Sequence, residues 1–332
     1  MSSIDRADIW FAVVNSFAAS KKATALWKSA EKLLKEREVT FHGVRTGSAG
    51  NAAELSFDAC MAGYRRFIAV GGDGTVHDVL NGIVAFIDWN ADYGRKASLA
   101  DFTLGVIPLG SGNDWIKSLG IRCNITDAVD VIKQENIARQ DVVRVSLLDP
   151  LALPHERPFS VSYMANVGGV GLDARVCELV NVKKKQGKSG KILYVTSLIQ
   201  ALAKRKHSKV KLLCDGREVF DGEYISMSFG IGKYSGGGMR QTPDAVLDDG
   251  LLDVSIIPEL PFHRILVEAP KLFTGKLTTV PELVTSKGKS MTVIPYEGNI
   301  EAAEVDGEVI GKAPIRLEVL PQQLNILLPA KR

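Results

Sequence analysis

The sequence predicts a two-domain α/β protein, with a doubly wound parallel sheet in the N-terminal domain and a mainly antiparallel β-sandwich in the second. The first observation is length, because 332 residues are about twice the roughly 150 residues of a typical domain. The second is that short apolar runs alternate with helical patterns over the first 135 residues, which is typical of βαβ units. The third is that hairpins and alternating strands follow from about residue 141. We therefore expect domains at 1–138 and 139–320, with the active site in the cleft between them.

The predicted strands of the first domain end at glycine-rich loops. Strand 66–70 is followed by Gly71 and Gly72, and strand 103–107 by Pro108 and a second glycine loop. The other predicted elements are strand 9–14, helix 21–36, strand 40–46, helix 51–62 and a helix from Thr75. In a parallel sheet covered on both faces, ligands bind where strands end and helices begin. The two loops are therefore candidates for a binding site.

The second domain is predicted from strands separated by turn signals. These signals include Asp215-Gly216 and Asp306-Gly307, a dipeptide typical of two-residue hairpins. The predicted strands are 141–147, 158–166, 209–214, 217–229, 251–257, 290–295, 300–305 and 315–320. Helices are expected near 172–203 and 262–273. The last predicted strand, 324–328, is a candidate to return to the first domain together with the rest of 321–332.

Composition is that of an ordinary globular protein. Hydrophobic residues are 45% and charged residues 24%, a balance that disfavours disordered, collagenous and membrane-channel proteins. The net charge of +3 gives no reason to expect a nucleic acid partner. Four cysteines are scattered without a C-x-x-C pair, so neither a zinc site nor a disulfide framework is predicted. Residues 1–14 contain Asp5 and Asp8 where a signal peptide would be basic, and we expect a cytoplasmic location.

The nearly neutral total conceals a basic segment. Residues 183–211 contain ten Lys and Arg and no Asp or Glu, so the rest of the chain carries −7. Between the two basic clusters, Ile192, Val195, Ile199 and Leu202 recur at helical spacing. One interpretation is an amphipathic surface that binds anionic lipid headgroups. The other is a core-packed helix with solvated flanks.

The two glycine loops suit a nucleotide. Residues 71–75 read GGDGT and residues 108–114 read PLGSGND, and each loop opens a predicted helix. Successive backbone N–H groups in front of a helix N-terminus form a cradle for phosphate. Asp73 and Asp114 add two carboxylates at the same edge of the sheet, as a nucleotide–metal site requires. A simpler interpretation of the first loop is a tight strand-to-helix turn with an Asp N-cap.

These segments resemble the diacylglycerol kinase catalytic domain family, which is shared with sphingosine kinases and bacterial lipid kinases and belongs to the NAD kinase-like superfamily. Residues 71–82, GGDGTVHDVLNG, resemble the signature GGDGTxxEVxNG, and residues 108–117, PLGSGNDWIK, are similar to PxGTxNDFAR. Further similar segments follow in order at 166–174, 236–253 and 306–308. The resemblance covers nearly the whole chain and implies a lipid kinase that uses ATP and Mg²⁺.

The resemblance also implies roles for individual residues. The residues that would line the ATP site are Asn15, Thr46, Gly71, Gly72, Gly74, Thr75, Gly110, Ser111, Asn113 and Asp114. Asp306 would be the general base toward the lipid hydroxyl, and Asp73 would organise Mg²⁺ with Glu308 as a helper. From the residues alone, Asp306 is more simply the first position of an Asp-Gly hairpin turn, and the resemblance reverses that preference.

A second, structural Mg²⁺ is implied in the loop 246–251. Asp249 would be its side-chain ligand, with backbone oxygens from Val246 and Leu251, and Asp141 would be linked into the same network. Such an oxygen-rich set suits Mg²⁺. The alternative is an acidic turn in front of a strand.

The expected substrate is a hydroxyl of a diacylglycerol-like lipid, taken from a membrane that the enzyme contacts peripherally. The alternatives are a kinase for a sphingoid base or phosphatidylglycerol, an NAD kinase, and a non-catalytic nucleotide- or lipid-binding protein. The chain departs from the family at 15–19, where relatives have Asn-Pro and a following glycine, and at Lys117, where Arg is frequent. Oligomeric state stays open, with a homodimer as one alternative.

Overall fold

The computed structural model describes residues 5–16, 23–47, 51–109, 113–149, 158–185, 191–203, 208–296, 301–312 and 314–330. The chain divides into two compact units, one formed by Met1–Gln140 with Gln322–Arg332 and the other by Asp141–Pro321. It passes from one unit to the other within two long strands, β5 (Ile137–Leu147) and β15 (Ile315–Leu327).

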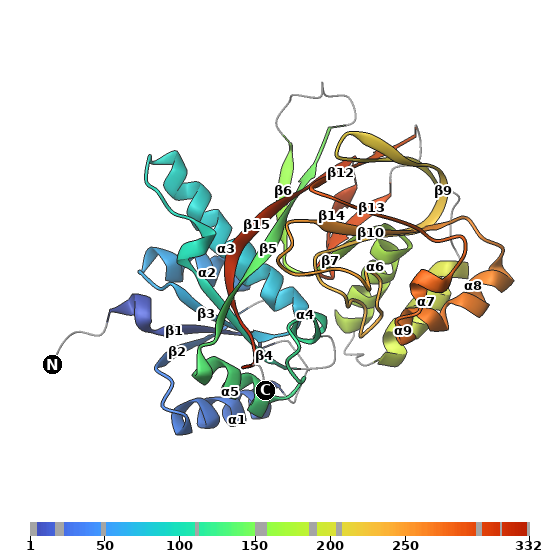
Figure 1. Ribbon diagram of the computed structural model, residues 1–332. Helices are drawn as coiled ribbons and strands as arrows, with labels where there is room; N and C mark the ends of the chain where they lie inside the picture. Colours follow the sequence, from blue (N-terminus) through green and yellow to red (C-terminus); the bar gives the residue numbers. More distant parts are fainter. Residues whose placement is uncertain are drawn as a thin grey trace. The chain divides into compact units, whose positions relative to one another are not determined.

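The first unit contains a parallel sheet. Its strands are β1 (Trp10–Val14), β2 (Phe41–Arg45), β3 (Arg66–Gly71), β4 (Thr103–Pro108) and the end of β15. Their order is β15-β4-β3-β1-β2, and each neighbouring pair is parallel (Figure 1). β1, β3 and β4 are buried along almost their whole length, as expected for strands covered on both faces.

Five α-helices accompany this sheet in the described part of the first unit. They are α1 (Ala23–Glu36), α2 (Asn51–Met61), α3 (Asp73–Asp92), α4 (Asp114–Ser118) and α5 (Ile125–Gln134), with short 3₁₀ turns η1 (Arg6–Asp8) and η3 (Leu99–Asp101). α1 packs beside α5, and α2 packs beside α3 (Figure 1). Gly82 permits the close approach of α3 to α2, because a Cβ there would lie 2.2 Å from the carbonyl oxygen of Ala53. The predicted α/β class is confirmed for this unit.

The second unit is built mainly from antiparallel strands. Beyond β5 and β15 these are β6 (Ser160–Met164), β7 (Val167–Gly171), β8 (Ser208–Cys214), β9 (Arg217–Gly230), β10 (Leu252–Pro258), β11 (Val284–Gly288), β12 (Ser290–Pro295), β13 (Ala302–Val305) and β14 (Glu308–Lys312). The main path is β14-β13-β7-β9-β8-β12-β15, while β10 pairs with β9 and β11, and β5 pairs with β6 and β15. The inward-facing side chains of most of these strands form one hydrophobic core. The predicted antiparallel class is confirmed.

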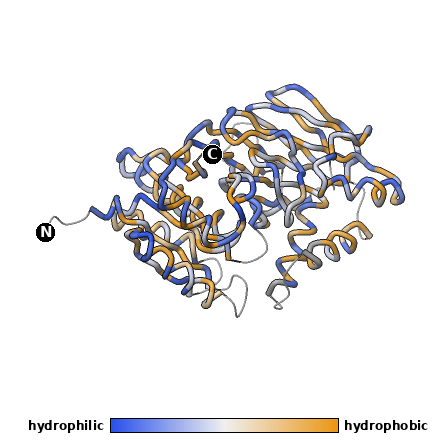
Figure 2. The backbone as a smooth tube through the Cα atoms, turned by 60° about the horizontal axis from the view of Figure 1, so that its bottom comes forward, coloured by the Kyte–Doolittle hydropathy of each residue, from blue (hydrophilic) through white to orange (hydrophobic). Residues whose placement is uncertain are grey.

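Helices of the second unit form a separate layer with its own apolar cluster. They are α6 (Leu172–Lys185), α7 (Lys191–Ala203), α8 (Phe262–Glu268) and α9 (Pro270–Thr274), followed by the 3₁₀ turn η4 (Leu277–Thr279). Val180 of α6 and Leu193 and Leu202 of α7 are buried together in this cluster. Figure 2 shows the backbone coloured by hydropathy, with apolar stretches in orange. The predicted helical region near 172–203 is thus two packed helices.

The predicted strands 315–320 and 324–328 are one continuous strand, β15. Within β15, Gln322 has a left-handed φ of 50°. The part of β15 before Gln322 belongs to the second unit, and the part from Gln322 onward belongs to the first. Asn325 pairs with Thr103 of β4 in a parallel register, so the end of the chain completes the first sheet.

Candidate functional site

Predicted nucleotide residues gather at one edge of the first sheet. Val14, Arg45 and Val70 are aligned across β1, β2 and β3, so the residues that follow these strands lie at the same level. Asn15 follows β1, Thr46 follows β2, and Gly72 follows β3. The structure therefore brings together residues from three separate parts of the predicted site.

Direct contacts hold this edge in place. The amide Nδ2 of Asn15 donates to Oγ1 of Thr75 at 3.0 Å, and the backbone N–H of Ser16 donates to Oγ1 of Thr46 at 3.1 Å. Thr75 is 1% exposed. A Cβ on Gly71 would lie 2.1 Å from Oγ1 of Thr75, so only glycine allows the first turn of α3 to fold against the end of β3.

Asp73 makes contacts that the sequence did not predict. Its Oδ1 accepts the backbone N–H groups of Asp114 at 2.8 Å and Trp115 at 2.9 Å, and its Oδ2 accepts the N–H of Asp114 at 3.0 Å. Asp73 is therefore a cap on α4 rather than on its own helix, where Gly72 is the N-cap. Its role with Mg²⁺ stays a prediction, and any ion bound here shares the carboxylate with this cap.

The second glycine loop is described only in part. Gly110 and Ser111, both predicted to contact ATP, lie outside the described residues. Asn113 and Asp114 are each 2% exposed, and Oδ1 of Asp114 pairs with Nζ of Lys117 at 2.5 Å. The backbone N–H of Leu109 donates to the carbonyl of Gly71 at 2.8 Å, so the starts of the two loops are hydrogen-bonded to each other.

In the second unit, Asp306 stands on the hairpin turn between β13 and β14. Asp306 has φ 52° and Gly307 has φ 87°, both in the left-handed region of a type I′ turn. The Asp306 carboxylate accepts the backbone N–H of Ala165 through Oδ2 and that of Asn166 through Oδ1, each at 2.9 Å. Asp306 is 5% exposed, whereas its predicted partner Glu308 is exposed.

In the same unit, Glu304 lies near Asp306, and Asp173 lies near Glu304. Glu304 is buried and accepts the backbone N–H of Gly307 through Oε2 at 2.9 Å. Burial, reinforced by the nearby Asp173 carboxylate, raises the pKa of Glu304 well above its usual value. Burial likewise raises the pKa of Asp173, against hydrogen bonds from Ser228 at 2.5 Å and Gln241 at 2.8 Å. Glu304 carries no motif signal in the sequence beyond standing two residues before the Asp-Gly turn.

The loop predicted to hold a structural Mg²⁺ is tied to Asp141. The carboxylate of Asp141 accepts the N–H of Gly250 at 2.7 Å, and its backbone N–H donates to the carbonyl of Leu247 at 2.8 Å. Oδ1 of Asp249 accepts the N–H of Leu251 at 3.0 Å. Carboxylate and carbonyl oxygens of this kind fit Mg²⁺. No group of three or more His, Cys, Asp or Glu side chains arranged for a metal occurs in the described part of the chain, so backbone oxygens would have to complete the set.

Two of the lysines in the basic segment 183–211 are paired with acids from outside the segment. Lys211 on β8 pairs with Glu218 at 2.8 Å, and both Lys209 and Lys211 approach Asp221 within 4 Å. These two lysines are therefore neutralised by acids from the neighbouring strand β9. The remaining basic residues of the segment flank α7 in the sequence, and within the described ranges no helix is long and apolar enough to span a membrane.

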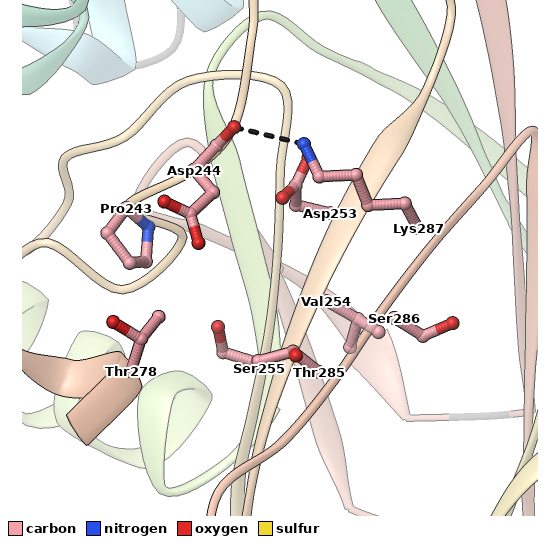
Figure 3. A pocket seen from close by; sticks show the side chains of 9 residues that line it. All are labelled: Pro243, Asp244, Asp253, Val254, Ser255, Thr278, Thr285, Ser286 and Lys287. Carbon is pink, nitrogen blue, oxygen red and sulfur yellow. Dashed lines mark hydrogen bonds and ion pairs between the residues drawn. The ribbon is translucent and has the colours of Figure 1, made fainter. Parts of the chain in front are cut away.

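A small pocket in the second unit lies beside the loop 246–251, since Asp244 and Asp253 line it and Asp249 acts on the pKa of Asp253. It has a volume of about 110 Å³ and is lined by residues of β10, β11 and the loop at 243–244 (Figure 3). Nζ of Lys287 donates to the carbonyl of Asp244 at 3.0 Å and pairs with Asp253 at 3.1 Å. Burial raises the pKa of Asp253, and Lys287 opposes that shift. The volume of this pocket is below the range of about 300–1,000 Å³ that small-molecule sites usually occupy.

Comparison with known proteins agrees with this arrangement. Residues 10–145 match the diacylglycerol kinase catalytic domain, and residues 166–328 match the YegS C-terminal NAD kinase beta sandwich-like domain. These two consecutive domains account for most of the chain, which therefore belongs to the diacylglycerol kinase family of lipid kinases.

Individual proteins similar to this chain are named as kinases of the same family. The chain is 28% identical over 289 residues to a "Probable lipid kinase YegS-like" of Pseudomonas putida, covering 86% of this chain and 84% of the relative. It is 27% identical over 284 residues to a "Diacylglycerol kinase" of Staphylococcus carnosus, covering 86% of this chain and 83% of the relative. A crystal structure of a diacylglycerol kinase from Bacillus anthracis strain Sterne has the same fold, with a TM-score of 0.70, 22% identity, and coverage of 97% and 98%.

Proposed function

We propose that the chain transfers the γ-phosphate of ATP to a hydroxyl of a diacylglycerol-like lipid. The observation that carries this proposal is the Asp306 carboxylate, which two backbone N–H groups hold in one orientation on a tight turn. In the transfer, the lipid hydroxyl oxygen forms a bond to the γ-phosphorus while the bond from phosphorus to the bridging oxygen of ADP breaks. The hydroxyl proton passes to the carboxylate of Asp306 as general base.

The first unit supplies the nucleotide site in this proposal. Backbone N–H groups of Gly72 and Gly74 and the N-terminus of α3 would bind phosphate oxygens, and the contact between Asn15 and Thr75 keeps this edge in shape. Mg²⁺, held through Asp73, would neutralise charge on the phosphates. Asn113 and Asp114 stay predicted ATP contacts, as do Gly110 and Ser111.

The test is transfer of labelled phosphate from ATP across a panel of lipid alcohols in mixed micelles. We expect label in phosphatidic acid when diacylglycerol is present, and much less with a sphingoid base or phosphatidylglycerol. Label that appears only in NADP when NAD is supplied would overturn the proposal. No turnover of ATP with or without any lipid would favour a non-catalytic nucleotide- or lipid-binding protein.

A matched pair of variants tests the base. Asp215 stands on a second Asp-Gly turn with φ 48°, and its carboxylate also accepts backbone N–H groups, from Lys289 and Ser290. Asp306→Asn and Asp215→Asn therefore disturb turns of the same type in the same unit. Loss of a general base typically lowers kcat about 10²–10⁴-fold, and we expect this only for Asp306→Asn.

We further propose that α7 and its basic flanks bind the surface of an anionic membrane, which would make the enzyme a peripheral one. Val195 and Ile199 of α7 are 42% and 54% exposed. They are four residues apart, so they lie on the same face of the helix, one turn from each other. Four lysines at 184, 185, 188 and 191 precede or begin α7, and three basic residues follow it at 204–206. Lys183 is not counted, because its Nζ donates to Oγ of the buried Ser197. An exposed apolar stripe between cationic clusters matches a lipid headgroup surface.

Vesicle sedimentation tests this surface. Binding is expected to rise with the fraction of phosphatidylglycerol and to fall with salt, because exposed charges are screened. Replacing Lys204, Arg205 and Lys206 by Ser should weaken binding, whereas replacing Lys209 and Lys211, which are paired with acids, should not. Equal binding to neutral vesicles at all salt concentrations would contradict the proposal.

A further inference from the structure

The Asp306–Gly307 turn is held by a helix outside its own hairpin. The carbonyl oxygen of Gly307 accepts hydrogen bonds from Sγ of Cys177 at 2.7 Å and from Nδ2 of Asn181 at 3.2 Å. Both donors lie on α6, one helical turn apart, and Nδ2 of Asn181 also lies 3.5 Å from Sγ of Cys177. Neither residue belongs to the hairpin or to a predicted site, and 126 residues separate Asn181 from Gly307.

The two backbone N–H groups of the turn are also bound. The N–H of Gly307 donates to Glu304 at 2.9 Å, and the N–H of Asp306 donates to the carbonyl of Val167 at 3.0 Å. Asp306 has a left-handed backbone, which is unfavourable for a residue with a Cβ unless its surroundings hold it there. The contact with α6 therefore completes a set of restraints on the residue that carries the proposed base.

The supporting helix is itself fixed inside the unit. Val180 of α6 is buried in the cluster that includes Leu193 and Leu202 of α7, and Nζ of Lys183 donates to Oγ of the fully buried Ser197 at 3.1 Å. Asn181 thus projects from a helix whose other contacts keep it in place. A side chain on a rigid element can restrain a turn more closely than a side chain on a loop.

From this geometry we infer that Asn181, with Cys177, is a positioning residue that holds the Asp306–Gly307 turn so that the Asp306 carboxylate can accept the proton of the lipid hydroxyl. This inference rests on the proposed function, because it assigns Asp306 as the base. It concerns the turn of α6 from Cys177 to Asn181, which the proposed membrane surface does not include.

The variants are chosen around the Gly307 carbonyl. Asn181→Ala removes the donor, and Asn181→Asp has the same shape but places a carboxylate oxygen against the carbonyl oxygen. Cys177→Ser keeps a donor, whereas Cys177→Ala removes it. Glu178→Ala is the control, because Glu178 is exposed on the same turn of α6.

We expect Asn181→Ala to lower kcat about tenfold, since a hydrogen bond of ordinary strength corresponds to roughly that factor in rate. Asn181→Asp should lower kcat further, and Cys177→Ser should retain more activity than Cys177→Ala. The KM for ATP and binding to anionic vesicles should stay within about twofold of the wild type, because a positioning contact acts on the transition state rather than on ground-state binding. Glu178→Ala should match the wild type.

Hydrogen exchange gives a readout that does not depend on activity. The N–H groups of Ala165 and Asn166 bond to the Asp306 carboxylate, so a loosened turn should increase their exchange in Asn181→Ala while β9 and β10 keep their protection. If the wild type phosphorylates no lipid but this local change is seen, the proposed function fails and the positioning contact stands. Unchanged kcat together with unchanged exchange at Ala165 and Asn166, or increased exchange throughout the unit, would overturn the inference.

Discussion

Asp73 offers the sharpest test of the site, because its predicted role with Mg²⁺ and its observed role as a cap have different consequences. Asp73→Ala removes the acceptor of two backbone N–H groups, those of Asp114 and Trp115. Both residues are at most 2% exposed, so water cannot readily replace the lost acceptor. In Asp73→Asn one side-chain oxygen remains, and it can accept both N–H groups that Oδ1 accepts in the wild type.

The expected effects follow from these contacts. A buried donor left without an acceptor costs about 1–3 kcal/mol, and loss of an Asp cap costs about 0.5–2 kcal/mol. We therefore expect Asp73→Ala to lower the free energy of unfolding by about 2–4 kcal/mol, and Asp73→Asn to lower it by about 1 kcal/mol. For a unit of this size each kcal/mol corresponds to about 2–4 °C in Tm.

The assay is calorimetric unfolding without nucleotide and with EDTA present, repeated with ATP and Mg²⁺. Asp58→Asn, on the exposed side of α2, is the control and should stay within about 0.5 kcal/mol of the wild type. If Asp73→Ala unfolds like the wild type in EDTA, the cap contributes nothing and the reasoning is refuted. A loss of stability seen only with Mg²⁺ would assign the residue to the metal alone.

Three further outcomes are expected. Gly71→Ala should destabilise the first unit by about 1–3 kcal/mol and raise the KM for ATP, because its Cβ would displace Thr75; normal stability by urea unfolding would contradict this. Since the pKa of Glu304 is raised in the folded state, its stabilising contribution is fully present below pH 4.5 and is lost as pH rises toward the folded value. Glu304→Gln should therefore flatten the decline of unfolding free energy between pH 4.5 and 8, and an unchanged slope would exclude Glu304 as its source. Asp141→Asn should weaken the loop contact with Gly250, and Mg²⁺ should raise the Tm of the wild type more than that of this variant; equal shifts would argue against a structural metal there.

Much of the architecture could be predicted from the sequence. Apolar runs that alternate with helical patterns indicate strands covered on both faces, and β1, β3 and β4 are buried as that pattern requires. The glycine loops indicate where strand ends meet helix starts. The Asp306-Gly307 dipeptide indicates a hairpin turn, and the backbone of both residues is left-handed there. These are local properties, set by side-chain periodicity and by the backbone freedom of a few residues.

The partners of the site residues were decided only by the tertiary structure. Asp73 caps a helix 41 residues further along the chain, and Asn181 meets a turn 126 residues away. Lys209 and Lys211 belong to a segment without acids, yet the pairing of β8 with β9 places Glu218 and Asp221 beside them. The physical reason is that local sequence determines the conformation of a segment and which of its faces is apolar. Which donors and acceptors meet depends on how segments far apart in the chain pack together.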